Sequence, residues 1–223
     1  MKQPRPFVVT IDGPAASGKG TLARRLADRF GFAHLDTGAL YRATALRVLD
    51  QAEDPSDPAI AEAAARRDDM QMLSNPRLRE PAVSAAASIV AAIPAVRSIL
   101  LGLQRQFAAH PPAPAKGAVL DGRDIGSVVC PSADAKIFLT ANAETRARRR
   151  LAELRQQGAT AIYENVLQDM KERDARDSGR PTAPLIAAPD AIVIETGTLD
   201  ADAVFERACD LIECTLKEME WQQ

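Results

Sequence analysis

The sequence has few of the residues that build metal centres. Its 223 residues include two histidines and three cysteines, at positions 130, 209 and 214. The cysteines are odd in number and lack the Cys-x-x-Cys spacing typical of zinc sites. We therefore expect no zinc centre, and a protein that works in a reducing compartment, the cytoplasm.

Long apolar runs and a strong excess of one charge are absent as well. The segment 7–11 is too short for the core of a secretion signal, and the apolar stretch 85–96 is interrupted by Ser88 and Pro94. Lys and Arg total 28 against 30 Asp and Glu, which gives a net charge of −2. That balance argues against a protein that coats nucleic acid or anionic membrane. We expect small-molecule partners, no nucleic acid, no membrane, and a monomer.

The composition that is present suits one globular domain of the α/β class. Hydrophobic residues make up 46% and charged residues 26%, and no linker-like segment divides the chain. Aliphatic runs predict strands at 7–11, 118–120, 136–140 and 191–194. Because these runs do not alternate with polar residues, they indicate strands buried on both faces of a parallel sheet. The helices are expected at 19–30, 39–49, 58–67, 79–92, 95–108, 143–157, 163–177 and 201–218.

The strongest motif follows the first expected strand and opens the first expected helix. Glycines allow backbone N–H groups to turn toward an anion, the helix N-terminus adds partial positive charge, and a lysine reaches the phosphates of a nucleoside triphosphate. The alternative, a glycine-rich turn without a ligand, explains fewer of these features at once. The predicted ATP-binding residues are Gly13, Pro14, Ala15, Ala16, Ser17, Gly18, Lys19, Gly20 and Thr21.

Two further sites can be proposed from the residues themselves. Arg42, on the helix after the Asp-Thr-Gly turn, is placed to grip a phosphate, and Thr37 offers a hydroxyl at the start of that helix. A capped helix with a solvated arginine is the alternative. Asp121 ends an apolar strand, where ligands of α/β sheets bind. Asp121 and Thr21 are possible magnesium ligands, although an aspartate in an ordinary turn is an alternative for Asp121.

Five motifs, in this order, resemble the bacterial cytidylate kinase family. They are GPAASGKGT at 13–21, DTGALYR at 36–42, SIVAAIPAVR at 88–97, DGRDIG at 121–126 and KERDARDSGR at 171–180. The resemblance implies a P-loop NTPase fold with an acceptor-nucleotide subdomain and a helical lid. It also implies phosphoryl transfer from ATP, with Mg²⁺, to CMP or dCMP. The parts it implies are a core of residues 5–36, 95–141 and 190–219, an acceptor subdomain of residues 37–94, and a lid of residues 142–180.

The resemblance assigns roles to individual side chains. Asp124 would accept a hydrogen bond from the cytosine amino group, and Asp177 would hold the acceptor sugar. The substrate-binding residues are expected to be Thr37, Arg42, Ser88, Arg97, Arg123, Asp124, Arg173, Asp177 and Arg180. The catalytic residues are expected to be Lys19, Arg123, Arg149 and Arg150.

The arginines of the expected lid have a plainer alternative. Arg146 and Arg150 fall four residues apart, on one helix face, and could point together at phosphates. Interleaved acidic residues are equally typical of a solvated Arg/Glu surface.

The chain departs from the family in its acceptor subdomain. The strand-bearing insert of the family is reduced to the remnant 70–73, and extra proline-rich residues lie at 110–116. A P-loop kinase with a relaxed or different acceptor, UMP or a small metabolite, is therefore the alternative function. A regulatory GTPase is disfavoured because no lysine follows an asparagine, as a guanine-reading motif requires.

Overall fold

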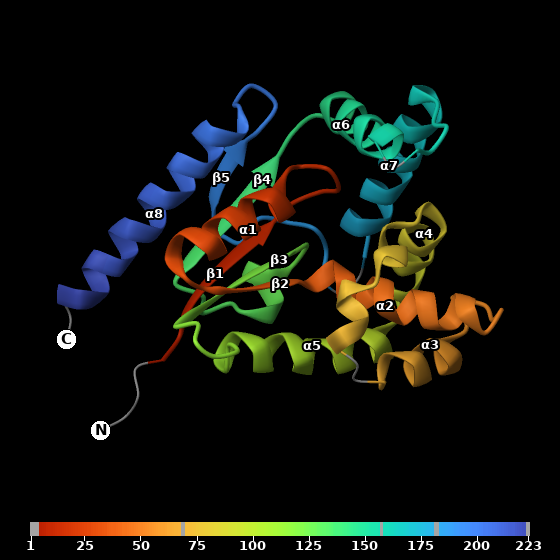
Figure 1. Cartoon of the computed structure of the whole chain (residues 1–223), viewed down its shortest axis with the longest axis horizontal. Coiled ribbons are helices and arrows are strands. Elements are labelled where there is room, and N and C mark those ends of the chain that lie inside the picture. Colours follow the sequence, from red (N-terminus) through yellow and green to blue (C-terminus); the bar gives the residue numbers. More distant parts are fainter. Residues whose placement is uncertain (1–4, 68–69, 157, 181–182, 222–223) are drawn as a thin grey trace. The chain divides into compact units, whose positions relative to one another are not determined.

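The computed structural model describes residues 5–67, 70–156, 158–180 and 183–221. Within them lies a five-stranded sheet with the strand order β2-β3-β1-β4-β5 (Figure 1). The pairs β1–β3, β1–β4 and β4–β5 are parallel, and Val9 of β1 stands opposite Val119 of β3 and Ala135 of β4. The expected α/β class with a parallel sheet is confirmed. The strands are β1 (Phe7–Asp12), β2 (Ala33–Asp36), β3 (Gly117–Gly122), β4 (Ala135–Thr140) and β5 (Ile192–Glu195).

Both edges of the sheet differ from the sequence prediction. Strand β2 was not predicted, because its four residues include a histidine and only Leu35 is buried. Strand β5 was predicted correctly in position, but the expectation that it is buried on both faces is wrong. Ile192 is 46% exposed and Val193 is 55% exposed, while Ile194 is buried. An aliphatic run therefore does not distinguish an edge strand from a central one.

The predicted helices are all present, with ends shifted by a few residues. Short 3-10 helices run over Met70–Ser74 and Pro76–Arg79, so the remnant at 70–73 forms no strand. The stretch 110–116 is a loop, as its prolines predict. The helices are α1 (Lys19–Phe30), α2 (Thr37–Asp50), α3 (Pro58–Ala65), α4 (Pro81–Val90), α5 (Pro94–Ala109), α6 (Ala143–Gln156), α7 (Tyr163–Ser178) and α8 (Ala201–Trp221).

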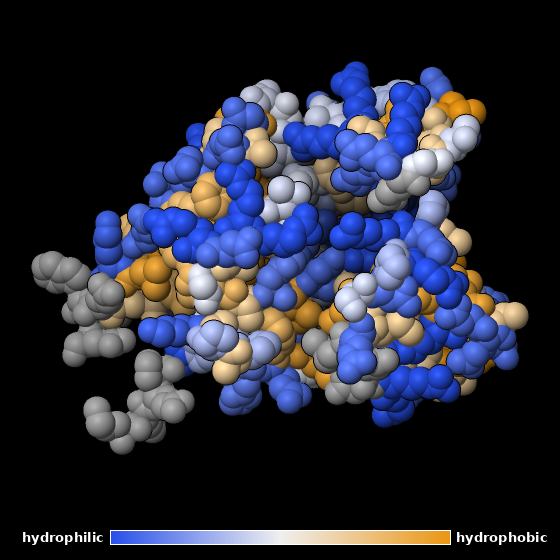
Figure 2. All heavy atoms as spheres, in the orientation of Figure 1, coloured by the Kyte–Doolittle hydropathy of each residue, from blue (hydrophilic) through white to orange (hydrophobic). Residues whose placement is uncertain are grey.

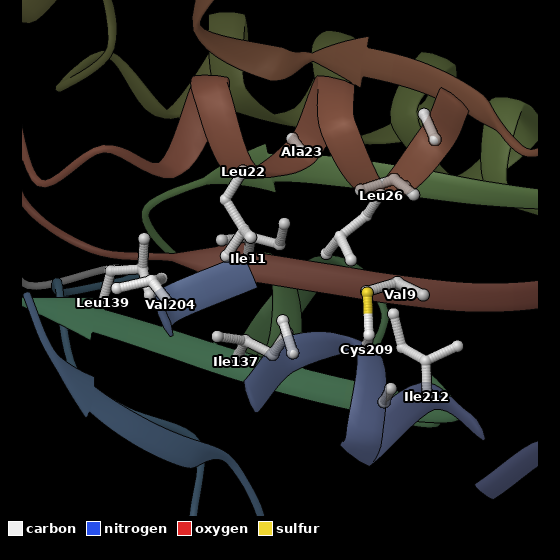
Figure 3. Packing of buried hydrophobic residues seen from close by; sticks show 14 of the residues in the cluster. Val9, Ile11, Leu22, Ala23, Leu26, Ile137, Leu139, Val204, Cys209 and Ile212 are labelled. Carbon is white, nitrogen blue, oxygen red and sulfur yellow. The ribbon is translucent and has the colours of Figure 1, made fainter. Parts of the chain in front are cut away.

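One apolar cluster holds the sheet between α1 and α8. Figure 3 shows Val9 and Ile11 of β1 beside Leu22 and Leu26 of α1 and beside Cys209 of α8. Leu22 and Leu26 lie four residues apart, so they share the helix face that the sheet covers. The burial of this face fixes the direction of α1, and with it the loop that precedes the helix.

The described chain separates into two compact units. The first runs through Leu35 and resumes at Ala108, so it contains the sheet, α1, α6, α7 and α8. The second, Asp36–Phe107, contains α2, α3 and α4 and almost all of α5. The sequence division had placed α5 with the core, whereas the boundary between the units lies near the end of this helix.

The described helices were compared with the length and apolar composition of a membrane span. No single described helix is long and apolar enough to cross a membrane. Helices α4 and α5 pass that test only as a pair, and they are bent by 101° at the break between them. The face shown in Figure 2 is mostly hydrophilic, with apolar residues in small groups.

We expect Leu26→Ala to lower the free energy of unfolding by about 2–5 kcal/mol, because the truncation opens a cavity under α1. Leu26 is fully buried. Asp28→Ala, at an exposed position of the same helix, is the control and should change it by less than about 0.5 kcal/mol. Urea denaturation of both variants is the measurement, and equal losses would contradict the packing assigned to α1.

Candidate active site

A phosphate-binding loop connects β1 to α1. A Cβ atom on Gly13 would lie 2.3 Å from the backbone oxygen of Leu139, so any other residue would collide with β4. Gly18 has a φ of 93°, in the left-handed region that favours glycine. Ala16 has a φ of 56°, which costs a residue with a Cβ about 1 kcal/mol. The loop is thus held in a strained shape that other sequences would not adopt.

Lys19 and Asp121 both lie close to the start of α1. The Lys19 Nζ atom donates to the carbonyl oxygen of Pro14, 3.1 Å away, so this side chain folds back over the loop. Asp121, at the end of β3, is buried and is hydrogen-bonded through Oδ1 to His34 Nε2 at 2.8 Å. Its Oδ2 atom lies 3.9 Å from where a Cβ of Gly20 would be. A carboxylate therefore sits against the loop, while Thr21 is exposed.

A cluster of three arginines surrounds Asp177 in the first unit. Arg123 Nε donates to Asp177 Oδ2 at 3.0 Å, and Arg180 Nη2 donates to Oδ1 at 2.5 Å. Arg173 Nε lies 3.9 Å from the same carboxylate. Burial opposes the ionisation of Asp177, but the three guanidinium groups outweigh it and hold its pKa below the ordinary value. Four of the predicted substrate-binding residues are thus brought together.

The neighbouring Asp124 is buried where β3 runs into the π-helical turn η3 (Ile125–Val129). Its backbone oxygen accepts hydrogen bonds from the N–H groups of Val128 and Val129, so the turn begins at this residue. Asp124 therefore lies at the start of a hydrogen-bonded turn, directly after Arg123.

The remaining predicted substrate residues lie in the second unit. Asp36, not Thr37, caps α2, because its carboxylate accepts from Ala39 N at 3.1 Å. Thr37 is the first residue of the helix and is buried. Arg42 Nη2 donates to Asp36 Oδ2 at 2.5 Å, whereas its Nε is buried with no hydrogen-bond partner among the described residues.

Two further predicted residues of this unit come from α4 and α5. Ser88 of α4 is buried. Arg97 of α5 donates to the Ala91 oxygen at 3.3 Å and lies over the ring of Tyr41, 5.9 Å from its centroid. This contact ties the DTGALYR motif to the last residue of the SIVAAIPAVR motif.

Two arginines of α6, Arg146 and Arg150, have different partners. Arg146 is buried and donates to both carboxylate oxygens of Asp174 on α7, at 3.2 and 2.6 Å. Arg150, four residues later, pairs with Glu153 at 3.2 Å. Arg146 thus joins α6 to α7, which lie side by side in Figure 1. That Arg146 and Arg150 point together at phosphates stays a prediction.

Arg149 binds the turn after β5. It donates to Thr196 Oγ1 at 2.9 Å and to the Thr196 oxygen at 2.5 Å. The buried Thr196 hydroxyl in turn lies 3.2 Å from the carbonyl oxygens of Ser17 and Thr140. The Thr140 oxygen already accepts a hydrogen bond from Thr196 N at 2.8 Å. The hydroxyl has a single proton, so we assign its hydrogen bond to the oxygen of Ser17, in the phosphate-binding loop.

Several residues of these networks were missed by sequence reasoning. Asp12, His34, Tyr41, Asp174 and Thr196 each contact a predicted residue or its turn. Tyr41 lies within the DTGALYR motif and could have been found there. Asp12 ends an apolar strand, like Asp121, and that pattern was a usable signal. The partners of Asp174 and Thr196 are distant in sequence and left no local signal.

The strand order and the loop between β1 and α1 define a P-loop NTPase fold. Solved structures of low identity share this fold. A gluconokinase from Sinorhizobium meliloti is 13% identical, with a TM-score of 0.51, and the match covers 99% of each chain.

The particular family follows from closer relatives. The cytidylate kinase family model matches residues 9–214. A cytidylate kinase of Rhodospirillum rubrum is 55% identical over 92% of this chain and 97% of its own length. One from a Methylobacterium species is 57% identical over 93% and 97%, respectively. The chain belongs to the cytidylate kinase family.

We expect Asp177→Asn to remove a negative charge whose contribution to the free energy of unfolding depends on pH. Because the pKa of Asp177 lies below 3.8 in the folded chain, its contribution is complete above that pH and disappears as the pH falls through the folded value. The variant should lose about 3–5 kcal/mol of unfolding free energy at pH 7, as expected for breaking a buried ion pair. The difference should shrink below pH 4. Asp169→Asn, exposed on α7, is the control, and a pH-independent difference would contradict this role.

Proposed function

We propose that this protein transfers the γ-phosphoryl group of ATP to CMP or dCMP, giving ADP and CDP or dCDP. The observation that carries the proposal is the family match, which spans residues 9–214 and thus both the phosphate-binding loop and the arginine clusters. The alternative acceptors, UMP or a small metabolite, have no support from the relatives, and no second function is proposed.

On the ATP side, the loop and Lys19 bind the β- and γ-phosphates. The backbone N–H groups and the N-terminus of α1 supply partial positive charge, and the Lys19 ammonium supplies a full one. Lys19 binds a carbonyl oxygen of its own loop, so a phosphate oxygen replaces a neutral acceptor. This exchange favours the phosphate, because hydrogen bonds between ionised partners are stronger.

On the acceptor side, the arginines bind the nucleotide phosphate and sugar. The buried Nε of Arg42 supports this role, because an N–H group without a partner is costly unless a ligand fills it. Arg123, Arg173 and Arg180 all face Asp177, which keeps three cations close together for an anion. Asp177 binds the sugar hydroxyls. The motifs DTGALYR and SIVAAIPAVR assign Thr37, Ser88 and Arg97 to acceptor binding as well.

Arg149 and Arg150 are proposed to stabilise charge on the transferring phosphoryl group. Both belong to α6, and both would exchange their present partners, Thr196 and Glu153, for phosphate oxygens as the lid closes. Hydrophilic residues dominate the surface over α6 and α7 in Figure 2, as expected for a segment that moves between solvent and substrate.

The residues around the loop fit Mg²⁺, which would offset charge on the ATP phosphates. Asp121 places a carboxylate against Gly20, and Thr21 offers a hydroxyl, both of which are hard oxygen donors. In the described part of the chain, no group of three His, Cys, Asp or Glu could hold a metal. Mg²⁺ is commonly bound by one or two protein oxygens together with substrate phosphates and water.

The proposal includes a monomer that works in the cytoplasm. The three cysteines are free thiols, which suits a reducing compartment. Sedimentation analysis tests whether the protein is a monomer in solution.

We expect Lys19→Met to lower kcat by roughly 10³–10⁵ while the fold stays intact, because a cation is lost from the transition state. Lys116→Met is the matched control, since Lys116 is an exposed lysine before β3. Coupled ADP-release assays, with circular dichroism to check folding, are the measurement. Near-normal turnover of a folded Lys19→Met variant would refute the donor site.

We expect the wild type to prefer CMP and dCMP over UMP, and Asp124→Asn to narrow that preference. A carboxylate accepts from the cytosine amino group and repels the uracil oxygen, whereas an amide can turn either end toward the base. Discrimination from such a buried hydrogen bond can reach about 10⁴–10⁵. The measurement is kcat/KM for both nucleotides at fixed ATP. An unchanged ratio in the variant would show that Asp124 does not read the base.

A further inference from the structure

Asp12 is a buried carboxylate that the proposed reaction leaves unused. It ends β1, directly before Gly13, and is 4% exposed. Burial, and secondarily the nearby Asp124, raise its pKa to about 6, against hydrogen bonds and Lys19, which lower it. A carboxylate kept in so costly a position needs partners that compensate it.

Both oxygens of Asp12 hold the turn that carries Asp124. Oδ1 accepts from the N–H of Ile125 at 2.8 Å, and Oδ2 accepts from the N–H of Gly126 at 2.7 Å. These are the first two N–H groups of η3, which have no acceptor within their own helical turn. The residue at the capping position, Asp124, makes no side-chain hydrogen bond to them. A residue from another strand therefore supplies the cap.

The approach of the two segments depends on Gly126. A Cβ atom there would lie 3.4 Å from Asp12 Oδ2 and 2.9 Å from Thr10 Oγ1. Only a residue without a side chain lets the backbone N–H come this close to the carboxylate without displacing Thr10. Because Asp12 caps η3, the carboxylate of Asp124 does not have to turn back on its own helix, as a capping aspartate does.

We propose that Asp12 is a positioning residue for base selection, because it fixes the turn from which Asp124 reads the acceptor base. This inference rests on the proposed function. Asp12 does not touch the nucleotide. It acts through the backbone of Ile125 and Gly126, and its effect belongs to the acceptor side of the reaction rather than to ATP.

Asp12→Asn tests this role with little change in size. An amide has one acceptor oxygen, so its NH₂ group meets one of the two backbone N–H groups and the turn has to shift. We expect the CMP dissociation constant, measured without ATP, to rise about tenfold or more, and the CMP/UMP ratio of kcat/KM to fall by a similar factor. The ATP dissociation constant should stay within about threefold.

Thr10→Val is the matched control. Thr10 lies on the same strand and next to the same glycine, but its buried hydroxyl has no hydrogen-bond partner among the described residues. This variant should leave the CMP/UMP ratio unchanged. Should Asp12→Asn fail to fold, Gly126→Ala attacks the same contact from the other side and should lower the ratio in the same direction.

The outcomes separate this inference from the function on which it rests. A wild type that phosphorylates no CMP would refute the proposed function, and the inference with it. A wild type that prefers CMP, with an unchanged ratio in the folded Asp12→Asn or Gly126→Ala variant, would refute the inference alone. The inference would also be refuted if Asp12→Asn weakened ATP binding as much as CMP binding. It would be refuted as well if Thr10→Val lowered the CMP/UMP ratio as much as Asp12→Asn does.

Discussion

Ion pairs between arginine and carboxylate recur among the candidate site residues of each unit. Asp177 receives Arg123, Arg173 and Arg180, Asp36 receives Arg42, and Asp174 receives Arg146. A protein that binds phosphates must hold several cations close to one another, and half-buried cations repel one another strongly. The carboxylates relieve that repulsion. They also fix each guanidinium in one orientation, which lowers the entropy that phosphate binding would otherwise cost.

The pairs do not all serve the same purpose. Arg146 is buried against Asp174 and the Ala141 oxygen, so it joins α6 to α7 and cannot swing away without unpairing a buried charge. Arg149 is half-buried and binds a hydroxyl and a carbonyl, both neutral groups that a phosphate can replace. The spacing of arginines along α6 does not distinguish these two cases, because the distinction lies in what the neighbouring elements present.

The sequence predicted most of the fold and part of the site. The helices were predicted because their apolar residues recur at helical spacing, and the loop at 13–21 because its glycines, lysine and flanking elements agree. Strand β2 was missed because a four-residue edge strand carries almost no pattern. The sequence does not decide which residue caps α2, since Asp36 and Thr37 are both good caps and only the backbone decides between them. Thr196 and Asp12 act through contacts more than 100 residues away in sequence.

The arginines of such a site exchange a carboxylate for a phosphate when a substrate binds, and this exchange sets the net gain in binding free energy. When a phosphate displaces a carboxylate from an arginine, one ionic hydrogen bond replaces another, so the net gain is smaller than the bare attraction suggests. Asp177 illustrates the consequence. If the arginines left Asp177, it would remain as an unpaired buried charge. The free-energy cost of that charge would cancel the gain from binding the phosphate. Sugar hydroxyls that donate to Asp177 would satisfy it while the arginines turn to the phosphate. On the proposed roles, a ligand that carries both groups would therefore be bound better than inorganic phosphate, which would leave the carboxylate unpaired.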